Sequence, residues 1–83
     1  MTMREYIGLI YKDVGSDYGV SFPDFPGLVI AGIDLDDARR MAEEALALHV
    51  EGMLEDGQAI PEPSRLNVEK SAFTLVPVRV TGI

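Results

Sequence analysis

Residues 18–37 read YGVSFPDFPGLVIAGIDLDD, and this stretch decides the fold. Its first apolar run ends at Pro23, because proline cannot donate a hydrogen bond to a neighbouring strand. Pro23 and Pro26 restrict the backbone around them, and Gly27 can supply a positive φ angle. A second apolar run, Leu28 to Ile33, follows this corner. The stretch therefore predicts two antiparallel strands joined by a rigid corner.

The segment before this stretch predicts a hairpin. Arg4 to Lys12 is short, apolar in its middle and rich in β-branched and aromatic residues, which is typical of a strand buried on both faces. Residues 13–17, which read DVGSD, have the composition of a turn. We therefore expect the segment 4–12 to pair with a second strand, Tyr18 to Phe22.

A long helix follows the third strand. Asp34 can cap the free amides of its first turn, and Asp37 stands three residues on, as in a capping box with a shorter acid. We expect the helix to run to about Asp56, because Gly57 suits the position after a helix. Its polar face holds Asp36, Arg40, Glu43, Glu44, Glu51 and Glu55. Its apolar face holds Leu35, Ala38, Met41, Ala42, Ala45, Leu46, Leu48, His49, Gly52 and Met53.

The rest of the chain supplies a linker and a last strand. Gln58 to Ser71 is polar, and the sequence Pro61-Glu62-Pro63 makes it stiff and extended. Ala72 to Val80 predicts a fourth strand, in which Pro77 favours an edge position. The predicted order is β-β-β-α-β. This is an α+β fold with a three-stranded antiparallel sheet, an additional edge strand and one long helix packed on one face.

Length and charge limit what the protein can do. The chain has 83 residues, enough for one domain, and it has no cysteine for a disulfide or a thiolate metal site. Its net charge of −7 repels nucleic-acid phosphates and attracts basic partners. No apolar run reaches the roughly 18 residues that a membrane span needs, and the first residues lack a signal-peptide pattern. We expect a soluble, cytoplasmic protein that contacts neither membrane nor DNA directly.

The apolar face of the predicted helix is wider than one sheet requires. It covers about half of the circumference, whereas a helix on a single sheet needs an arc of about 100°. Because small domains are often stabilised by self-association, we expect a homo-oligomer, most simply a dimer. We place His49, Met53, Val76 and Val78 in its interface. The alternative for His49, the one histidine, is an ordinary packed side chain.

The acidic residues do not form the pattern of a nuclease. Three antiparallel strands followed by a helix and a strand begin a ribonuclease-H-like topology, in which cleavage with two metal ions needs several converging carboxylates. The first strand, Tyr6 to Tyr11, has no acid, and the other acids stand in turns, at the helix cap or on its polar face. We expect no enzymatic activity, no cofactor and no metal site. The alternative is a residual metal-dependent ribonuclease that uses Asp24 and Asp34.

The combined motifs resemble the HicB antitoxin family over nearly the whole chain. The strand Tyr18 to Phe22 and the corner Pro23 to Gly27 precede a capped helix. The matching pattern continues with Asp37-Ala38, Glu44-Ala45-Leu46, Leu54-Glu55-Asp56-Gly57 and Ile60-Pro61-Glu62-Pro63-Ser64. The resemblance implies a partial ribonuclease-H-like fold and the antitoxin of a type II toxin–antitoxin system. Such an antitoxin binds and inhibits a HicA-like toxin, a small basic ribonuclease.

The resemblance also suggests a domain organisation and a second alternative for the function. Many family members continue into a DNA-binding module, whereas the printed sequence stops at Ile83. We therefore expect residues 1–83 to form one HicB-like antitoxin domain without such a module. The further alternative is an orphan self-assembling domain that has no toxin.

The toxin interface is expected at the proline corner. A rigid loop loses little entropy on binding, and an acid there suits a basic partner. We therefore predict Asp24 and Phe25 as the leading contacts. The alternative is that Phe25 turns into the core and that Asp24 only caps its own turn.

Overall fold

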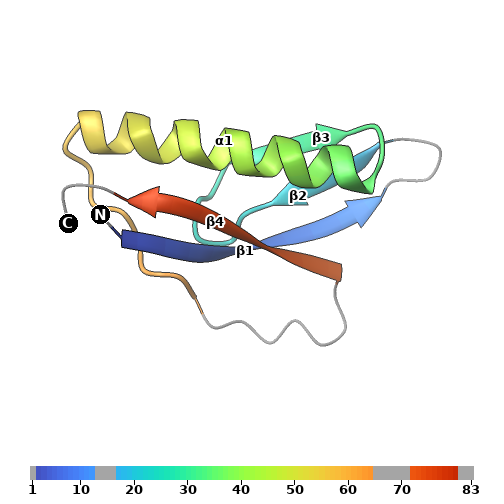
Figure 1. Cartoon of the computed structure of the whole chain (residues 1–83), viewed down its shortest axis with the longest axis horizontal. Helices are drawn as coiled ribbons and strands as arrows, with labels where there is room; N and C mark the ends of the chain where they lie inside the picture. Colours follow the sequence, from blue (N-terminus) through green and yellow to red (C-terminus); the bar gives the residue numbers. More distant parts are fainter. Residues whose placement is uncertain (1, 13–16, 65–71, 81–83) are drawn as a thin grey trace.

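The computed structural model describes residues 2–12, 17–64 and 72–80. Four strands and one helix follow each other in the order β1 (Thr2–Lys12), β2 (Tyr18–Ser21), β3 (Val29–Gly32), α1 (Leu35–Glu55) and β4 (Ala72–Val80). The strands form one antiparallel sheet in the order β3-β2-β1-β4, and α1 lies across one of its faces (Figure 1). The predicted β-β-β-α-β fold is confirmed.

Strand β1 organises the sheet because it is long enough to pair along both sides. Its first part pairs with β4, with Tyr6 opposite Val76, and its last part pairs with β2, with Tyr11 opposite Gly19. Strand β4 is an edge strand, as Pro77 predicted. Strand β2 pairs only with the last part of β1. The corner after β2 and the segment after α1 lie beside the first part of β1.

The ends of α1 follow the signals in the sequence. The Asp34 carboxylate accepts a hydrogen bond of 2.7 Å from the backbone amide of Asp37, which confirms Asp34 as the N-cap. The Asp37 carboxylate reaches back past the cap and accepts a 3.0 Å bond from the amide of Ile33. At the other end Gly57, with a φ of 73°, donates to the carbonyl of Leu54. This left-handed glycine ends the helix as predicted.

The core lies between α1 and the inner face of the sheet. The residues of α1 that are buried there repeat every four positions, and they are Ala38, Ala42, Leu46 and Val50. The first of them lies against β3, where a Cβ on Gly32 would come within 2.4 Å of the Ala38 backbone nitrogen. Opposite them the sheet contributes Tyr6, Val20, Val76, Val78 and Val80. Leu48, by contrast, is 69% exposed.

Two predictions about burial were wrong. Val76 and Val78 face α1 and are almost fully buried, so they seal the core and cannot form an interface with a second chain in this conformation. Strand β1 is not buried on both faces, because α1 covers only one of them. On the other face Ile7 is nearly buried, whereas Met3 and Tyr11 are exposed.

Candidate protein-binding surface

The proline corner is folded into the domain and tied to the segment that follows α1. Within the corner the amide of Phe25 donates to the carbonyl of Phe22, and the amide of Leu28 donates to the carbonyl of Phe25. The Asp24 carboxylate does not cap this turn. It accepts a 3.0 Å hydrogen bond from the amide of Ser64, 40 residues away, and a second one from the Ser64 hydroxyl. We call this pair of bonds the Asp24–Ser64 contact.

Phe25 is a core residue, so the prediction that it is an exposed toxin contact was wrong. Its side chain is only 2% exposed. Its ring meets that of Tyr6 edge to face with centroids 4.9 Å apart, and that of His49 with centroids 5.6 Å apart. The two prolines therefore turn this aromatic ring inward and hold it beneath the helix.

The predicted interface residues on α1 lie at the border of the core. His49 is exposed, although its ring touches Phe25. Met53 is half-buried and packs against the core cluster. Their part in an oligomer stays a prediction.

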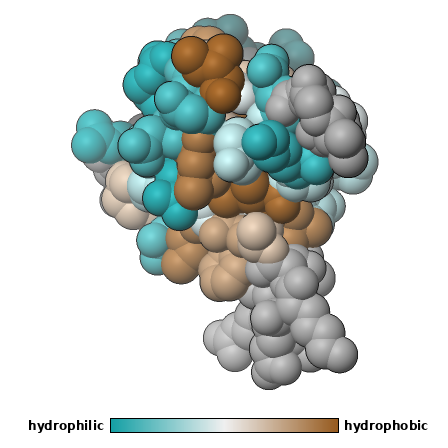
Figure 2. All heavy atoms as spheres, turned by 90° about the vertical axis from the view of Figure 1, so that its right-hand side faces the viewer, coloured by the Kyte–Doolittle hydropathy of each residue, from teal (hydrophilic) through white to brown (hydrophobic). Residues whose placement is uncertain are grey.

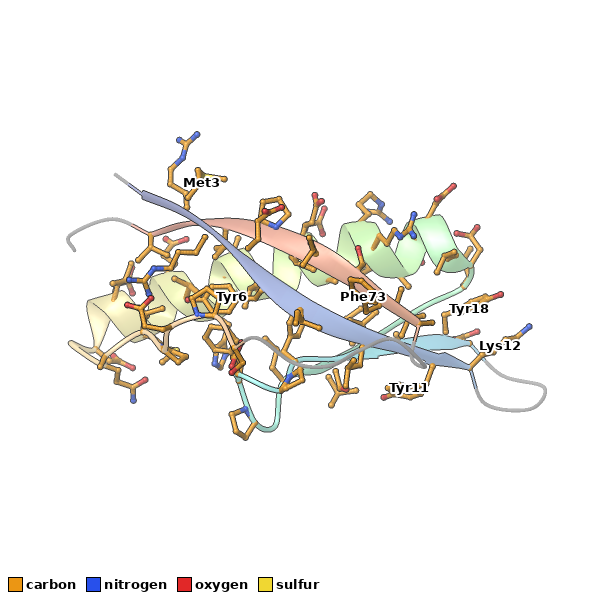
Figure 3. The ribbon with its side chains drawn as sticks, turned by 90° about the horizontal axis from the view of Figure 1, so that it is seen from below. Met3, Tyr6, Tyr11, Lys12, Tyr18 and Phe73 are labelled. Atoms are coloured by element: carbon orange, nitrogen blue, oxygen red, sulfur yellow. The ribbon has the colours of Figure 1, made fainter. Side chains whose placement is uncertain are left out.

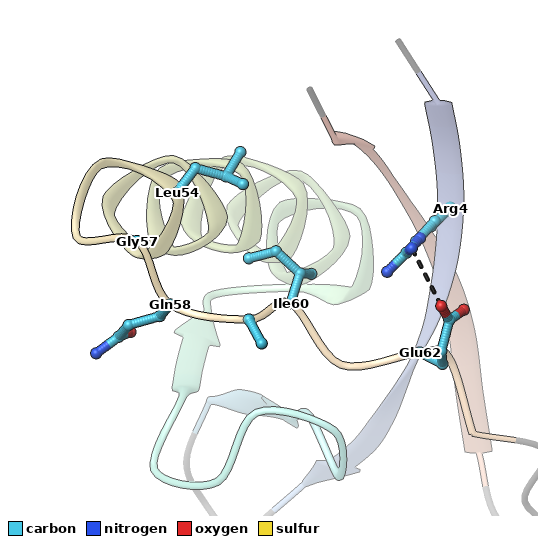
Figure 4. Close-up of a pocket in the computed structure, with 7 residues that line it drawn as sticks. Arg4, Leu54, Gly57, Gln58, Ile60 and Glu62 are labelled. Carbon is cyan, nitrogen blue, oxygen red and sulfur yellow. Dashed lines mark hydrogen bonds and ion pairs between the residues drawn. The ribbon is translucent and has the colours of Figure 1, made fainter. Parts of the chain in front are cut away.

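A second connection anchors the segment after α1 to the start of β1. The Tyr6 hydroxyl donates a 2.5 Å hydrogen bond to the carbonyl of Pro61 and accepts one of 3.5 Å from Arg4. Arg4 also pairs with Glu62 at 3.2 Å (Figure 4). The bond to Tyr6 raises the pKa of Arg4; burial opposes this rise, and the charge of Glu62 adds to it. The segment is therefore fixed against β1 rather than free.

Two grooves flank the C-terminal half of α1, and both are bordered by Leu54. One, of about 440 Å³, is also lined by Arg4, Gly57, Gln58, Ala59, Ile60 and Glu62 (Figure 4). The other, of about 370 Å³, lies between α1 and β4 and is lined by Ala47, Glu51, Leu54, Val78 and Arg79. Apolar side chains thus stand beside acids on both sides of the helix. We call Glu51, Leu54, Glu55 and Asp56 the α1 C-terminal surface.

The charges of the two halves of α1 differ. In the N-terminal half, Arg40 pairs with Asp37 at 2.5 Å and with Glu44 at 3.4 Å. The acids of the first turn interact favourably with the positive end of the helix dipole. From Ala45 to Glu55 the charged residues are Glu51 and Glu55, and the last turn has no basic residue. Acids at this end oppose the helix dipole, and Glu51 and Glu55 also repel each other at a spacing of four residues.

Glu51 and Glu55 were predicted on the polar face of the helix, but not as residues that bind a partner. The signal was present, because a helix whose last turn lacks any lysine or arginine departs from the usual charge pattern. Among the described residues, no group of three or more acids and histidines is placed to hold a metal ion. In the same part of the chain, no helix has both the length and the apolar character needed to cross a membrane.

Comparisons with known proteins agree with this architecture. A protein of Haemophilus phage HP1, described as an uncharacterized 14.9 kDa protein in the rep–hol intergenic region, is 47% identical over 51 residues, or 61% of this chain and 38% of that protein. The crystal structure of the Burkholderia pseudomallei antitoxin HicB is 33% identical with a TM-score of 0.72, over 87% of this chain and 61% of that one. The chain therefore spans less than two thirds of the length of each of these two relatives.

A toxin–antitoxin complex from Streptococcus pneumoniae is also similar, with 26% identity and a TM-score of 0.81 over 96% of this chain and 71% of the matched one. The family described as HicB-like antitoxin of bacterial toxin–antitoxin systems matches residues 6–75, from β1 into β4. This match includes the corner, the whole of α1 and the Asp24–Ser64 contact. The chain belongs to the HicB-like antitoxin family.

Proposed function

We propose that this domain is the toxin-binding part of a type II antitoxin and that it inhibits a HicA-like basic ribonuclease. Membership of the antitoxin family supports the general role. The net charge of −7 supports a basic partner, because opposite charge speeds association and orients the two proteins.

One observation carries the choice of surface: the acids of the α1 C-terminal surface weaken the helix that bears them. Glu51 and Glu55 stand near the negative end of the helix dipole, and neither forms an ion pair with another described residue. A lysine or arginine in their place would favour the helix. A basic partner that covers this surface would offset the repulsion between these glutamates. The acids therefore lower the stability of the free domain but favour binding of a basic partner.

The grooves explain how lysine and arginine side chains of a toxin would bind. Such side chains have apolar stems and charged ends. In the groove between α1 and β4, Ala47 and Val78 supply an apolar lining and Glu51 supplies a carboxylate, while Arg79 on β4 places one cation at the same groove. The basic ends would therefore have to lie on the α1 side of the groove, away from Arg79. Stems would lie in the groove while the charged ends pair with Glu51 and Glu55. Covering these basic groups would deprive the toxin of the residues that attract RNA phosphates.

The test first asks whether a small basic protein is encoded beside this chain, and then measures RNA cleavage by that protein with increasing amounts of the purified chain. We expect cleavage to stop near equimolar ratio. Inhibition should weaken as salt rises, because the Debye length falls from about 10 Å at 0.1 M to about 3 Å at 1 M salt.

Two results would contradict the proposal. Cleavage that continues at a large excess of the chain excludes an inhibitor of that protein. Cleavage of RNA by the chain alone with magnesium or manganese, lost in Asp24→Asn, would favour the ribonuclease alternative.

A further inference from the structure

Leu48 is an exposed leucine on the outward side of α1. Its side chain is 69% exposed, whereas Leu46 and Val50, the buried residues of the same part of the helix, pack against the sheet. Hydrophobic residues gather below the helix in Figure 2, so an apolar side chain on the helix itself is unusual for this molecule. One exposed leucine is ordinary by itself. Its neighbours on the helix make it informative.

Gly52 lies one turn further along α1, on the same side of the helix as Leu48. Glycine inside a helix is less favourable than alanine, because it loses more backbone freedom on folding. Gly32 is required by its close approach to Ala38, and Gly57 by its positive φ. A Cβ on Gly52 would find open space, and the φ of Gly52 is not positive. Of the described glycines, Gly52 alone is not required by the fold.

Two acids border this pair of residues. Glu51 and Glu55 follow Leu48 by three and seven positions, so all four residues lie on one side of the helix. We call Leu48, Glu51, Gly52 and Glu55 the Leu48–Gly52 surface. It combines a projecting apolar side chain, an open position with no side chain, and two carboxylates. A second copy of this acidic surface would be repelled, whereas a basic protein would be attracted.

The Leu48–Gly52 surface is separate from the other exposed apolar side chains of the molecule. Figure 3 shows the molecule from the sheet side, with Tyr11 and Phe73 on the strands in front of α1. Leu75 on β4 belongs to this side, because its neighbour Val76 is turned toward the helix, and Leu75 is 49% exposed. Leu75 is therefore a matched leucine on the opposite side of the domain.

We infer that the toxin of the proposed function packs on the Leu48–Gly52 surface, with Leu48 in an apolar recess of the toxin and the toxin backbone against Gly52. Basic side chains beside that recess would pair with Glu51 and Glu55. The inference rests on the proposed function and adds what determines specificity. Charge attracts any basic protein, but a leucine that projects beside a glycine accepts only a partner of matching shape.

The two leucines give the first test, in the RNA-cleavage assay of the proposed function. Leu48→Ala should inhibit the toxin at least about 10-fold more weakly than the native chain, because the side chain that fills the recess is lost. Leu75→Ala removes the same atoms from the opposite side of the domain and should inhibit within about threefold of the native chain. Both variants should stay folded by circular dichroism, because both side chains are exposed.

Gly52 gives the second test, in which stability and binding should change in opposite directions. Gly52→Ala and Gly52→Leu should both unfold at a higher urea concentration than the native chain, because both residues favour a helix more than glycine does. Gly52→Ala should nevertheless inhibit about threefold more weakly, and Gly52→Leu at least about 10-fold more weakly, because a side chain holds the toxin backbone away. A merely structural role of Gly52 could not separate the two measurements.

The outcomes distinguish this inference from the proposed function. Native inhibition that persists in Leu48→Ala and Gly52→Leu would overturn the inference and leave the proposed function intact. A loss of stability in Gly52→Ala would also overturn it, because the fold itself would then need this glycine. A native chain that does not inhibit the toxin would contradict the proposed function, and this inference with it.

Discussion

The face of the sheet turned away from α1, which we call the outer sheet face, and the α1 C-terminal surface carry different kinds of exposed side chain. The first is largely apolar, with Phe73 and Leu75 exposed on the edge strand β4, and its charged residues among the described strands are Glu5 and Arg79. The second carries Glu51, Glu55 and Asp56 and has no base in its last helical turn. Neither composition follows from the needs of the fold, because the core lies between them. The difference means that a basic partner would be attracted to the second surface and not to the first.

The largest effect should come from the layer that separates the two surfaces. Leu46 on α1 is fully buried, so Leu46→Ala should lower the free energy of unfolding by about 2–5 kcal/mol, as other buried leucines do. Leu48→Ala, two residues on, should change it by no more than about 0.5 kcal/mol. Urea denaturation of both variants measures the contrast. Equal losses would mean that the outward side of α1 is part of the core.

The Asp24–Ser64 contact should contribute less to the free energy of unfolding, about 1 kcal/mol, because it lies near solvent. Asp24→Ala loses both hydrogen bonds, and Ser64→Ala loses the one from the hydroxyl. In the double variant the second substitution should add almost nothing, because its partner is already gone. Chemical denaturation of the four proteins gives the coupling energy. Strictly additive losses would show that the contact is absent in solution.

A smaller effect of opposite sign is expected on the α1 C-terminal surface. Glu51→Lys with Glu55→Lys keeps two like charges four residues apart, but it replaces acids by cations at the negative end of the helix dipole. The double variant should unfold at a higher urea concentration, with a gain of roughly 0.3–1 kcal/mol at low salt. Added salt should reduce the gain. A less stable variant would mean that these glutamates support the helix in a way that its charges do not indicate.

The smallest effect concerns pH at the other end of α1. The amide of Ile33, and then Arg40, hold the pKa of Asp37 below its ordinary value of 3.8. The stabilisation that ionised Asp37 provides is therefore complete above about pH 4, the pKa of this carboxyl in the unfolded chain. It is lost as pH falls through the lower pKa of the same carboxyl in the folded chain. The melting temperature of Asp37→Asn should fall less steeply than that of the native chain below pH 4. Parallel curves would contradict this role.

Most of the fold could be predicted from the sequence because its signals are local. Asp34 and Gly57 mark the ends of α1 by backbone geometry alone, and Pro77 marks an edge strand. Whether Val76 or Leu75 faces the helix could not be decided in the same way. Both are apolar neighbours in one strand, and only the register with β1 assigns Val76 to the core.

The candidate site was harder to predict because it depends on contacts between distant segments. Asp24 and Ser64 are 40 residues apart, and nothing near Asp24 in the sequence indicates this partner. Phe25 was predicted to be an exposed contact because it stands in a rigid corner with two prolines. In the structure its ring packs edge to face against the rings of Tyr6 and His49. The part of the linker from 65 to 71 lies outside the described residues.

Inhibition of toxin-catalysed RNA cleavage by the charge-reversed variant is the most direct test of the toxin-binding surface. Glu51→Lys with Glu55→Lys should inhibit at least about 10-fold more weakly than the native chain. The control, Asp17→Lys with Glu43→Lys, makes the same change in net charge at two exposed sites. Asp17 directly precedes β2, and β2 begins at the opposite end of the molecule from the C-terminal end of α1 (Figure 1). It should inhibit within about threefold of the native chain. Equal inhibition by both variants and the native chain would contradict the assignment of the toxin to the α1 C-terminal surface.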